Sequence, residues 1–388
     1  MQPHPPRPLR ILILIDELLN LGGTERNLVR LLLRFPPEQF AFHIVTYAFN
    51  PEVPSFSQLP FPMKVLPLKR IYTPNGVRLG FQLSRILRQW RIDLVHCFFE
   101  SSDLWGAPIA KLAGLPVISS RRDMGIHRHR LHNFLYRFVS PHFDQVQAVS
   151  SELRRWLIEH DRLDQARVVT MPNGVDLDEM KPSTPAAETR LLLGLPASGR
   201  LVTSVANLRQ VKGQDTLLEA AARIAPDFPD IHFVLAGTPL ESDFVARLHE
   251  LASRPELAGR VHMPGSVKDV PSLLAASTVF VLPSRSEGMS TALLESMGAA
   301  LPAIATRTGG NPELVADGTS GLLTPVGDAA ALASALSDLL GRPERAAQLG
   351  QAAFEKVRAE YSIDSVVIRM AAEYKRISGR GPASGDEV

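Results

Sequence analysis

Two glutamates, Glu287 and Glu295, stand eight positions apart in the segment 283–313, PSRSEGMSTALLESMGAALPAIATRTGGNPE. The residues beside Glu295 are apolar on nearly every side of a helix, so its carboxylate is expected to be buried. A buried carboxylate needs hydrogen-bond donors, and the two adjacent hydroxyls of a ribose are suitable donors. The pattern favours a nucleoside site. The alternative interpretation is a helix with one exposed glutamate and no ligand.

The elements that must position these glutamates are a strand, a loop and a helix. Residues 277–283, STVFVLP, form an apolar run that predicts a buried strand of a parallel sheet. Ser290 is the expected N-cap of a helix over 291–300 that ends near Gly298. This order of elements aims backbone N–H groups and the positive end of a helix dipole at a phosphate.

A second strand and loop follow at 302–310, PAIATRTGG. Asn311 is the expected N-cap of the next helix, and Pro312 its first residue. Two such loops on adjacent parallel strands make a crevice at the carboxyl edge of a sheet, where open α/β folds bind ligands.

Length and composition restrict the class of protein. A chain of 388 residues fits two domains, and 45% hydrophobic with 21% charged residues is typical of a globular protein. The net charge of +2 argues against nucleic acid as the principal partner. The single cysteine, Cys97, fits a reducing compartment and excludes a cysteine metal cluster.

The amino terminus carries basic residues ahead of the apolar run 11–15, which stops at Asp16. That run is shorter than the apolar core of a signal peptide and is interpreted as the first buried strand. No apolar run approaches the length of a membrane-spanning helix. We therefore expect a cytoplasmic protein, and peripheral contact with the inner face of the cell membrane stays open.

The pattern Glu, seven residues, Glu, then Pro and Thr-Gly-Gly-x-x-Glu resembles the C-terminal half of the retaining glycosyltransferases of family 4, also described as glycosyl transferases group 1. The resemblance is weak over 11–180 and strong over 200–325. It implies an α/β protein of the GT-B fold, in which two doubly wound Rossmann-like domains face each other across a cleft.

The resemblance and the composition together predict the domain organisation. An N-terminal, acceptor-side domain is expected over 1–180, and a linker rich in Pro, Ala, Ser and Thr over 181–199. A C-terminal domain that binds the nucleotide-sugar follows over 200–360. A helix at 361–378 is expected to pack back on the first domain, and a small, polar tail at 379–388 is expected to be disordered.

The resemblance also implies roles for residues of the donor site. Glu287 would contact the transferred sugar, and Lys212 would offset diphosphate charge as a point cation. At the position five residues before Lys212 the family usually has an arginine, where this chain has Asn207, so Arg209 is the candidate for the missing charge. The other candidate donor-binding residues are Glu295, Gly288, Met289, Ser290, Gly265, Val267 and the pair Gly22 and Gly23.

The glycine pair follows the first predicted strand, and Thr24 is the expected N-cap of the helix after it. Glycines there let backbone approach a ligand closely, although a simple turn is the alternative. His96 ends another predicted strand, DLVHCFF. It is interpreted as a core histidine with its ring hydrogen-bonded, and the alternative is the family's similar Asp-x-x-His segment.

A basic loop, RRDMGIHRHR, follows the predicted strand at 117–120. Arg122 stands where many family members have a histidine that contacts the reacting sugar, and it is retained as a candidate catalytic residue. Arg121, Asp123 and His127 are candidates on the acceptor side. Clustered arginines suit phosphate or anionic lipid, and a solvated loop is the alternative. A metal site built on the histidines is not favoured.

These expectations combine into a retaining, metal-independent glycosyltransferase of the hexosyltransferase class. It would move a sugar from a nucleotide-diphosphate sugar to a hydroxyl acceptor, in polysaccharide, glycolipid or cell-envelope glycan synthesis. No cofactor is expected, because donors aimed at the leaving diphosphate supply the main catalytic effect. The basic loop favours a lipid-linked or phosphate-bearing acceptor. Alternatives are a sugar-nucleotide epimerase, a phosphorylase, or a catalytically silent scaffold that binds nucleotide-sugar.

Overall fold

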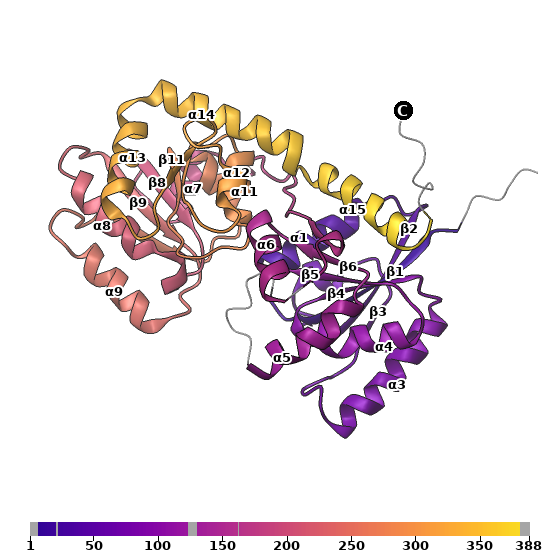
Figure 1. Cartoon of the computed structure of the whole chain (residues 1–388). Helices are drawn as coiled ribbons and strands as arrows, with labels where there is room; N and C mark the ends of the chain where they lie inside the picture. The colour runs from indigo at the N-terminus through magenta and orange to yellow at the C-terminus, as the bar shows by residue number, and fades with distance from the viewer. Residues whose placement is uncertain (1–6, 21, 123–129, 162, 381–388) are drawn as a thin grey trace, which may run out of the picture. The chain divides into compact units, whose positions relative to one another are not determined.

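The computed structural model describes residues 7–20, 22–122, 130–161 and 163–380 (Figure 1). The chain forms two compact units. Unit 1 combines Met1–Asn173 with Ile363–Val388, and unit 2 is Gly174–Ser362.

Unit 1 is built on a seven-stranded sheet in the order β3-β2-β1-β4-β5-β6-β7, and every neighbouring pair is parallel. Residues 11–15 of the central strand β1 have no solvent exposure, because strands of a parallel sheet are covered by helices on both faces. The strands are β1 (Leu9–Leu18), β2 (Phe40–Phe49), β3 (Met63–Val65), β4 (Leu94–Phe98), β5 (Val117–Arg121), β6 (Gln145–Ala148) and β7 (Val168–Thr170).

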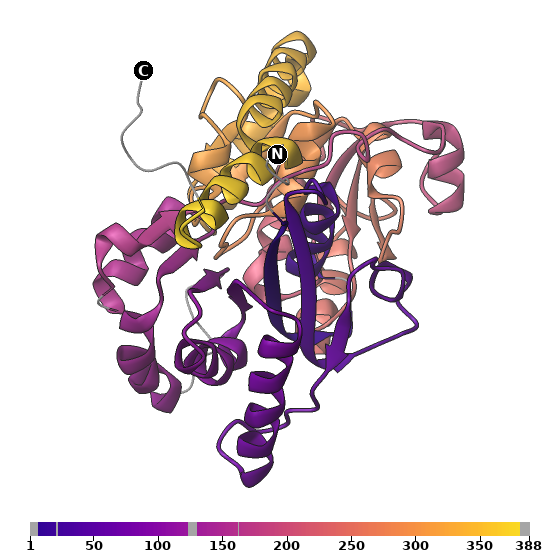
Figure 2. The same cartoon turned by 90° about the vertical axis from the view of Figure 1, so that its right-hand side faces the viewer.

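The helices of unit 1 bury their apolar faces on this sheet. They are α1 (Gly23–Arg34), α2 (Pro54–Ser57), α3 (Pro74–Gln89), α4 (Ala107–Leu112), α5 (Arg130–Val139), α6 (Ser151–His160) and α15 (Ile363–Ile377), with the short turns η1 (Ser102–Gly106), η2 (Ser140–His142) and η3 (Gln165–Arg167). The helix predicted at the end of the chain is α15, which packs against α1. Figure 2 shows this yellow helix beside the indigo start of the chain.

Tyr374 of α15 is fully buried in the core of unit 1, and its hydroxyl lies 2.8 Å from Nδ1 of His96. The interpretation of His96 as a hydrogen-bonded core histidine is confirmed. Of the tail predicted to be disordered, Gly379 and Arg380 are described, and Arg380 donates to the carbonyl of Arg7 (2.8 Å). Residues 381–388 lie outside the described residues.

Unit 2 contains a six-stranded sheet in the order β10-β9-β8-β11-β12-β13, again with parallel pairs throughout. Its strands are β8 (Arg200–Val205), β9 (Ile231–Ala236), β10 (Val261–Gly265), β11 (Val279–Leu282), β12 (Ala303–Thr306) and β13 (Leu322–Thr324). Its helices are α7 (Ala186–Leu192), α8 (Gln214–Ile224), α9 (Ser242–Ala252), α10 (Val270–Ala275), α11 (Thr291–Gly298), α12 (Asn311–Leu314), α13 (Ala329–Gly341) and α14 (Pro343–Lys356), with the turns η4 (Gln210–Lys212) and η5 (Val357–Tyr361).

Unit 2 begins at Gly174, earlier than the predicted linker at 181–199. The N–H of Val175 donates to the carbonyl of Tyr361 (2.9 Å), which ties the two ends of the unit together. The segment 181–199 contains α7, which packs on α10 within the same unit. Across the described ranges, none of the helices has the length and apolar character needed to span a bilayer.

Candidate functional site

The candidate donor site lies where the strand order of unit 2 reverses. The chain runs from β8 outward through β9 and β10, then returns to add β11 on the other side of β8. Ligands of open α/β sheets bind at such a reversal, beyond the carboxyl ends of the two strands. The loops after β8 and β11 therefore form the expected position for a ligand.

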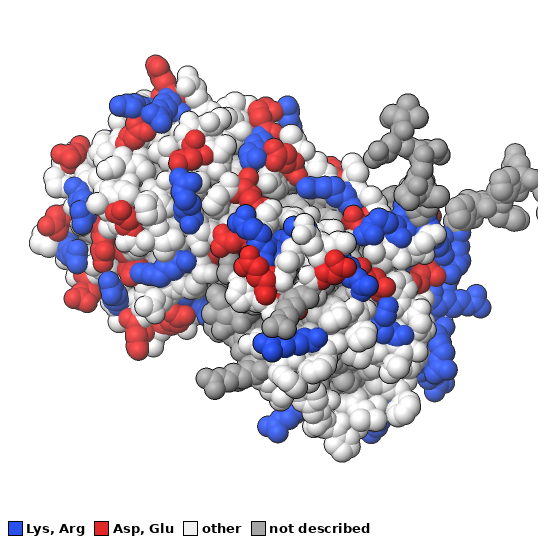
Figure 3. Space-filling model, in the orientation of Figure 1, with Lys and Arg blue, Asp and Glu red and all other residues white. Residues whose placement is uncertain are grey.

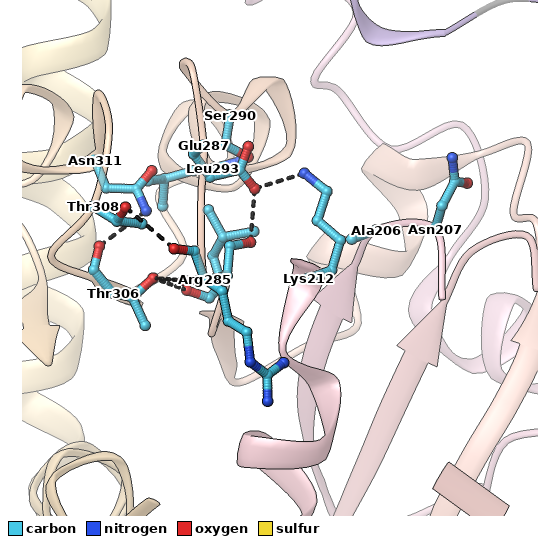
Figure 4. Close-up of polar contacts among 12 residues, drawn as sticks. Ala206, Asn207, Lys212, Arg285, Glu287, Ser290, Leu293, Thr306, Thr308 and Asn311 are labelled. Carbon is cyan, nitrogen blue, oxygen red and sulfur yellow. Dashed lines mark hydrogen bonds and ion pairs between the residues drawn. The ribbon is translucent and has the colours of Figure 1, made fainter. Parts of the chain in front are cut away.

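Lys212 and Glu287 come from these two loops and form an ion pair, with Lys212 Nζ 2.7 Å from Glu287 Oε1 (Figure 4). The hydroxyl of Ser284 donates to the same carboxylate oxygen at 2.7 Å. The Glu287 side chain is 7% exposed and that of Lys212 is 27% exposed. The carboxylate is thus fixed by two donors, while the Lys212 side chain stays partly exposed.

The helix after Glu287 begins as predicted. Ser290 is the N-cap of α11, and its hydroxyl accepts from the N–H of Leu293 at 3.2 Å. Met289 and Glu295 are both buried. The positive end of the helix dipole and the loop from Gly288 to Ser290 lie on the carboxyl side of β11.

The loop of Glu287 is held by the loop after β12. The N–H of Gly310 donates to the carbonyl of Gly288 (2.9 Å). Gly309 has φ +56°, and a Cβ there would collide with the carbonyl oxygen of Glu287. Glycine is therefore required on two grounds, the left-handed backbone and the close approach.

The prediction of Asn311 as an N-cap is wrong. Gly310 occupies the cap position, and Asn311 is the first residue of α12. Its side-chain amide instead donates to the carbonyl of Thr306 at 3.0 Å, and the hydroxyl of Thr306 donates to the carbonyl of Ser284. These bonds connect the loops after β11 and β12 (Figure 4).

Asn207 and Arg209 lie in the same loop as Lys212. Figure 4 shows Asn207 on the far side of Lys212 from Glu287, and the backbone carbonyl of Asn207 accepts from the Gln214 side chain at 3.0 Å. Arg209 forms an ion pair with Glu241 at 3.1 Å, in which both side chains are well exposed. Its charge is partly offset in this structure.

Two of the predicted donor-binding residues, Gly265 and Val267, lie at the end of β10 and just beyond it. Gly265 is the last residue of that strand, has φ +77°, and accepts from the N–H of Gly237 at 2.8 Å. Val267 follows it and packs against a small apolar cluster of unit 2.

Unit 1 has its own reversal of strand order, between β1 and β4. A cavity of about 660 Å³ lies there. Asp16, near the end of β1, accepts from the N–H groups of Ser101 and Ser102 after β4, at 2.8 and 2.7 Å. The cavity is lined by Asp16, Glu17, Glu25, Tyr47, Ala48, Pro67, Leu68, Lys69, Phe99, Glu100, Ser101, Asp103, Ser120, Arg121, Arg122 and Tyr136.

Arg121 is the last residue of β5 and is not part of a solvated loop. Its Nη1 lies 3.1 Å from Asp103 Oδ2, and these side chains are only 4% and 1% exposed. The guanidinium lies 4.0 Å from the centre of the Tyr136 ring. Burial raises the pKa of Asp103. Burial is also the largest single effect on Arg121 and favours its neutral form, but Asp103, Tyr136 and Asp161 together outweigh it and raise the pKa of the arginine.

This buried pair contains polar atoms that lack a hydrogen-bond partner. Nε and Nη2 of Arg121 and Oδ1 of Asp103 have no hydrogen-bond partner among the described residues. Arg122 donates from Nη1 to the Asn173 side chain at 2.8 Å, and burial lowers its pKa to about 10, which leaves it charged at neutral pH. The predicted acceptor-side residues Asp123 and His127 lie outside the described residues.

The glycine pair lies at the start of α1, where Gly22 is the N-cap and Gly23 the first helical residue. Thr24, the expected N-cap, is already inside the helix. Glu25 follows in the first turn and lines the cavity. A Cβ on Gly22 would collide with the Glu25 carboxylate.

Sequence reasoning missed Asp16, Asp103 and Tyr136. Asp16 could have been predicted from the sequence, because a carboxylate at the end of a buried central strand lies at the edge of the sheet where ligands bind. Asp103 and Tyr136 could not, since only the fold brings them to Arg121. Within residues 7–20, 22–122, 130–161 and 163–380, no three His, Cys, Asp or Glu side chains are grouped to hold a metal.

Two parallel-sheet, Rossmann-like units, each with polar side chains at its reversal of strand order, define a protein of the GT-B fold, as predicted from the sequence. HepE of Anabaena, solved in complex with UDP, superposes with a TM-score of 0.84 at 21% identity, over 95% of this chain and all of HepE. HepE was also solved with UDP-glucose.

Family models match both halves of the chain. Residues 21–179 match Glycosyltransferase Family 4, and residues 189–356 match Glycosyl transferases group 1. The chain belongs to the family 4 glycosyltransferases.

Named relatives fall in the same class. The alpha-maltose-1-phosphate synthase of Mycolicibacterium smegmatis is 32% identical over 250 residues, which are 61% of this chain and 64% of the synthase. The UDP-Gal:alpha-D-GlcNAc-diphosphoundecaprenol alpha-1,3-galactosyltransferase of Escherichia coli is 26% identical over 332 residues, or 81% and 84% of the two chains. The match thus covers less than two thirds of the synthase's length.

Proposed function

We propose that this protein transfers a sugar from a nucleotide-diphosphate sugar to a hydroxyl acceptor, with retention of anomeric configuration and without a metal ion. The observation that carries the proposal is the contact of Lys212 with Glu287 at the reversal of strand order in unit 2. A cation and a fixed carboxylate at this edge suit a diphosphate and a polyhydroxylated sugar.

The donor would lie along the loops of unit 2. Glu295 would accept from the ribose hydroxyls, and Lys212 with the backbone N–H groups of 288–290 would hold the diphosphate. Glu287 would accept from a hydroxyl of the transferred sugar. The remaining donor contacts are assigned to Asn207, Arg209, Gly265, Val267, Gly22 and Gly23.

The chemical step breaks the bond between the anomeric carbon and the diphosphate oxygen, and the electron pair leaves with the nucleoside diphosphate. Lys212 and the α11 N-terminus would stabilise that charge, which is the largest catalytic effect expected here. The acceptor oxygen attacks from the same face and forms the new bond to the anomeric carbon. Its proton passes to the departing phosphate oxygen, so the step balances without another base or a cofactor.

The acceptor is assigned to the cavity of unit 1. Arg121 and Asp103 there retain unpartnered polar atoms that suit hydroxyls, with Arg122, Asp123 and His127 as further contacts. The Escherichia coli relative is named for an acceptor on diphosphoundecaprenol, which supports a lipid-linked, phosphate-bearing acceptor in the synthesis of a polysaccharide, glycolipid or cell-envelope glycan. A cytoplasmic enzyme working at the inner face of the cell membrane follows from that assignment.

A thermal-shift panel of nucleotide-diphosphate sugars tests the donor site. We expect one donor to raise the melting temperature of the wild type and the Glu295→Gln variant to bind it about tenfold to a hundredfold more weakly, the loss expected for charge-assisted hydrogen bonds. Glu188→Gln, on the exposed side of α7, is the control and should bind like the wild type. A panel in which every donor fails to bind the wild type would overturn the site. A donor that binds but yields no transferred sugar would favour the silent scaffold.

A further inference from the structure

The exposed aromatic side chains of the protein are gathered in one region of unit 1. In the described part of the chain, four Phe and Tyr side chains are exposed, by between 54% and 75%: Tyr72, Phe81, Phe134 and Phe138. They belong to α3, to α5 and to the residues just before α3. Aromatic side chains on a water-exposed surface need an explanation when they cluster.

The two helices are connected through η1 and through one ring contact. Both pack against η1, and the ring of Tyr72 lies 6.4 Å from that of His132 on α5. Phe134 and Phe138 contact each other edge to face, at 5.0 Å between ring centres. Val77 of α3 and Leu131 of α5 add two more exposed apolar side chains. We call the surface made by Tyr72, Val77, Phe81, Leu131, Phe134 and Phe138 the aromatic surface.

The charge around the aromatic surface is mainly positive, and Glu100, which pairs with His132, is an acidic neighbour. Residues 53–92 contain no aspartate or glutamate, but they contain the basic residues Lys64, Lys69, Arg70, Arg78, Arg85, Arg88 and Arg91. Helix α5 likewise contains arginine and no acid. Figure 3 agrees, since the lower end of unit 1 on this face shows Lys and Arg among uncharged residues. The net charge of only +2 for the whole chain conceals this asymmetry.

Exposed aromatic residues with basic neighbours match the chemistry of an anionic bilayer surface. Phenylalanine buries its ring at the boundary of head groups and acyl chains, while arginine binds lipid phosphates. Each basic residue near an anionic surface adds attraction that decays within a Debye length. A protein partner with an acidic face would explain the arginines but would not require four separate aromatic side chains to stay exposed.

We propose that the aromatic surface docks unit 1 on a membrane that contains anionic lipid. The aromatic surface is the part of the protein that would make the membrane contact given under the proposed function. It shares no residue with the donor site of unit 2. Docking is independent of sugar transfer, so a failure of either proposal is distinguishable from a failure of the other.

Vesicle flotation of the full chain tests the docking. We expect binding to phosphatidylcholine vesicles that contain phosphatidylglycerol, weaker binding as salt is raised, and little binding to phosphatidylcholine alone. The double variant Phe134→Ser/Phe138→Ser should lower the partition coefficient at least about tenfold, because it removes two inserting side chains. The variant Arg78→Gln/Arg85→Gln should lose the preference for anionic vesicles.

The matched control is Leu191→Ser, which replaces an even more exposed apolar side chain on α7 of unit 2 and should float like the wild type. The donor-induced thermal shift of every variant should equal that of the wild type, which shows that the fold and donor site persist. Equal flotation of Phe134→Ser/Phe138→Ser and the wild type would overturn the proposal. So would a self-association of the wild type that these replacements abolish without any effect on vesicles, since the partner would then be a second copy.

Discussion

Lys212 Nζ lies 2.7 Å from Glu287 Oε1, although the two residues are 75 positions apart and follow different strands. The pair places a positive charge and a fixed carboxylate at one point of unit 2. If both residues act on the donor, their replacements should affect different kinetic constants.

The Glu287→Gln variant should lower kcat by about a hundredfold to a thousandfold, the usual loss for one fixed catalytic group. Its KM for the donor should stay the same or fall, because Lys212 is released from its ion pair and can bind the diphosphate. Initial rates at varied donor concentration measure both constants. A raised KM with unchanged kcat would contradict the proposed role of Glu287.

The Lys212→Met variant should raise the donor KM and also lower kcat, since the ammonium would bind the diphosphate before and during bond breaking. Lys181→Met is a suitable control, because Lys181 forms an exposed pair with Asp178 in the same unit. Its kinetic constants should match the wild type. Equal rates for Lys212→Met and Lys181→Met would remove Lys212 from the mechanism.

Replacing Gly309 by alanine should both destabilise unit 2 and displace Glu287. The left-handed conformation alone costs an alanine about 1–2 kcal/mol, and here the new Cβ also meets the Glu287 carbonyl. Gly318→Ala is the matched control, because Gly318 has φ +75° with open space around its Cβ position. Calorimetric melting and donor titration should show a larger loss for Gly309→Ala. Similar losses in both variants would mean that the loop contact has no role.

The buried pair of Arg121 and Asp103 should be sensitive to the loss of one partner. Asp103→Asn should destabilise unit 1 by about 3–5 kcal/mol, because it leaves a buried guanidinium without its counter-charge. All three tryptophans, Trp90, Trp105 and Trp156, lie in unit 1, so urea unfolding followed by tryptophan fluorescence reports on this unit.

The matched control for that pair is the partly exposed ion pair of Lys111 with Asp144 (2.9 Å). Lys111→Met should cost no more than about 1 kcal/mol. A loss for Asp103→Asn as small as that of the control would show that the pair contributes little to folding.

A structural feature of this protein could be predicted from the sequence when the residues that decide it are close together in the chain. Ser290 was placed correctly as an N-cap, since capping is decided within one helical turn. Asn311 was misplaced, because its amide is drawn to a carbonyl on the preceding strand, which no local rule includes. Unit 2 begins at Gly174, and the bond between Val175 and Tyr361 near its two ends joins residues that are far apart in the chain.

In the candidate site, too, single residues could be predicted from the sequence but their contacts could not. Glu287 and Lys212 were singled out individually through a family resemblance, but their contact follows from the adjacency of β8 and β11. Arg121 was expected in a basic loop and is instead the buried end of a strand, because Asp103 and Tyr136 offset its charge from elements that are distant in sequence. The sequence therefore predicted the individual helices and strands better than it predicted which of them lie next to one another.

His96 predicts how the stability of unit 1 changes with pH. Burial, and secondly the charge of Arg122, lower the pKa of His96 well below its usual range. Below a pH of about 6.5 the unfolded chain therefore binds a proton at His96 that the folded unit does not bind, so the contribution of His96 to stability must fall as the pH falls. The fluorescence assay should show a shallower fall in His96→Gln than in the wild type, whereas His160→Gln, on the exposed end of α6, should follow the wild type. If the free energy of unfolding changed with pH equally in all three proteins, His96 would not be the cause of the change.

Chelation tests the metal-independent mechanism. With EDTA present, the initial rate of sugar transfer should stay within about twofold of the untreated enzyme, because Lys212 and helix N–H groups would carry the leaving-group charge. A loss of about tenfold or more that magnesium or manganese restores would show that a cation takes part in the reaction.

The placement of α15 has a consequence for the order in which the protein is made. Tyr374 and its helix complete the apolar core of unit 1, whose other elements are synthesised first. Unit 2 is one continuous stretch, so we expect it to fold once it has left the ribosome, whereas we expect the core of unit 1 to stay incomplete, with its binding surface for α15 uncovered, until α15 is made. The segment made first is thus the last to reach its native state, and a nascent chain stalled before Ile363 would be the form most exposed to chaperones and proteases.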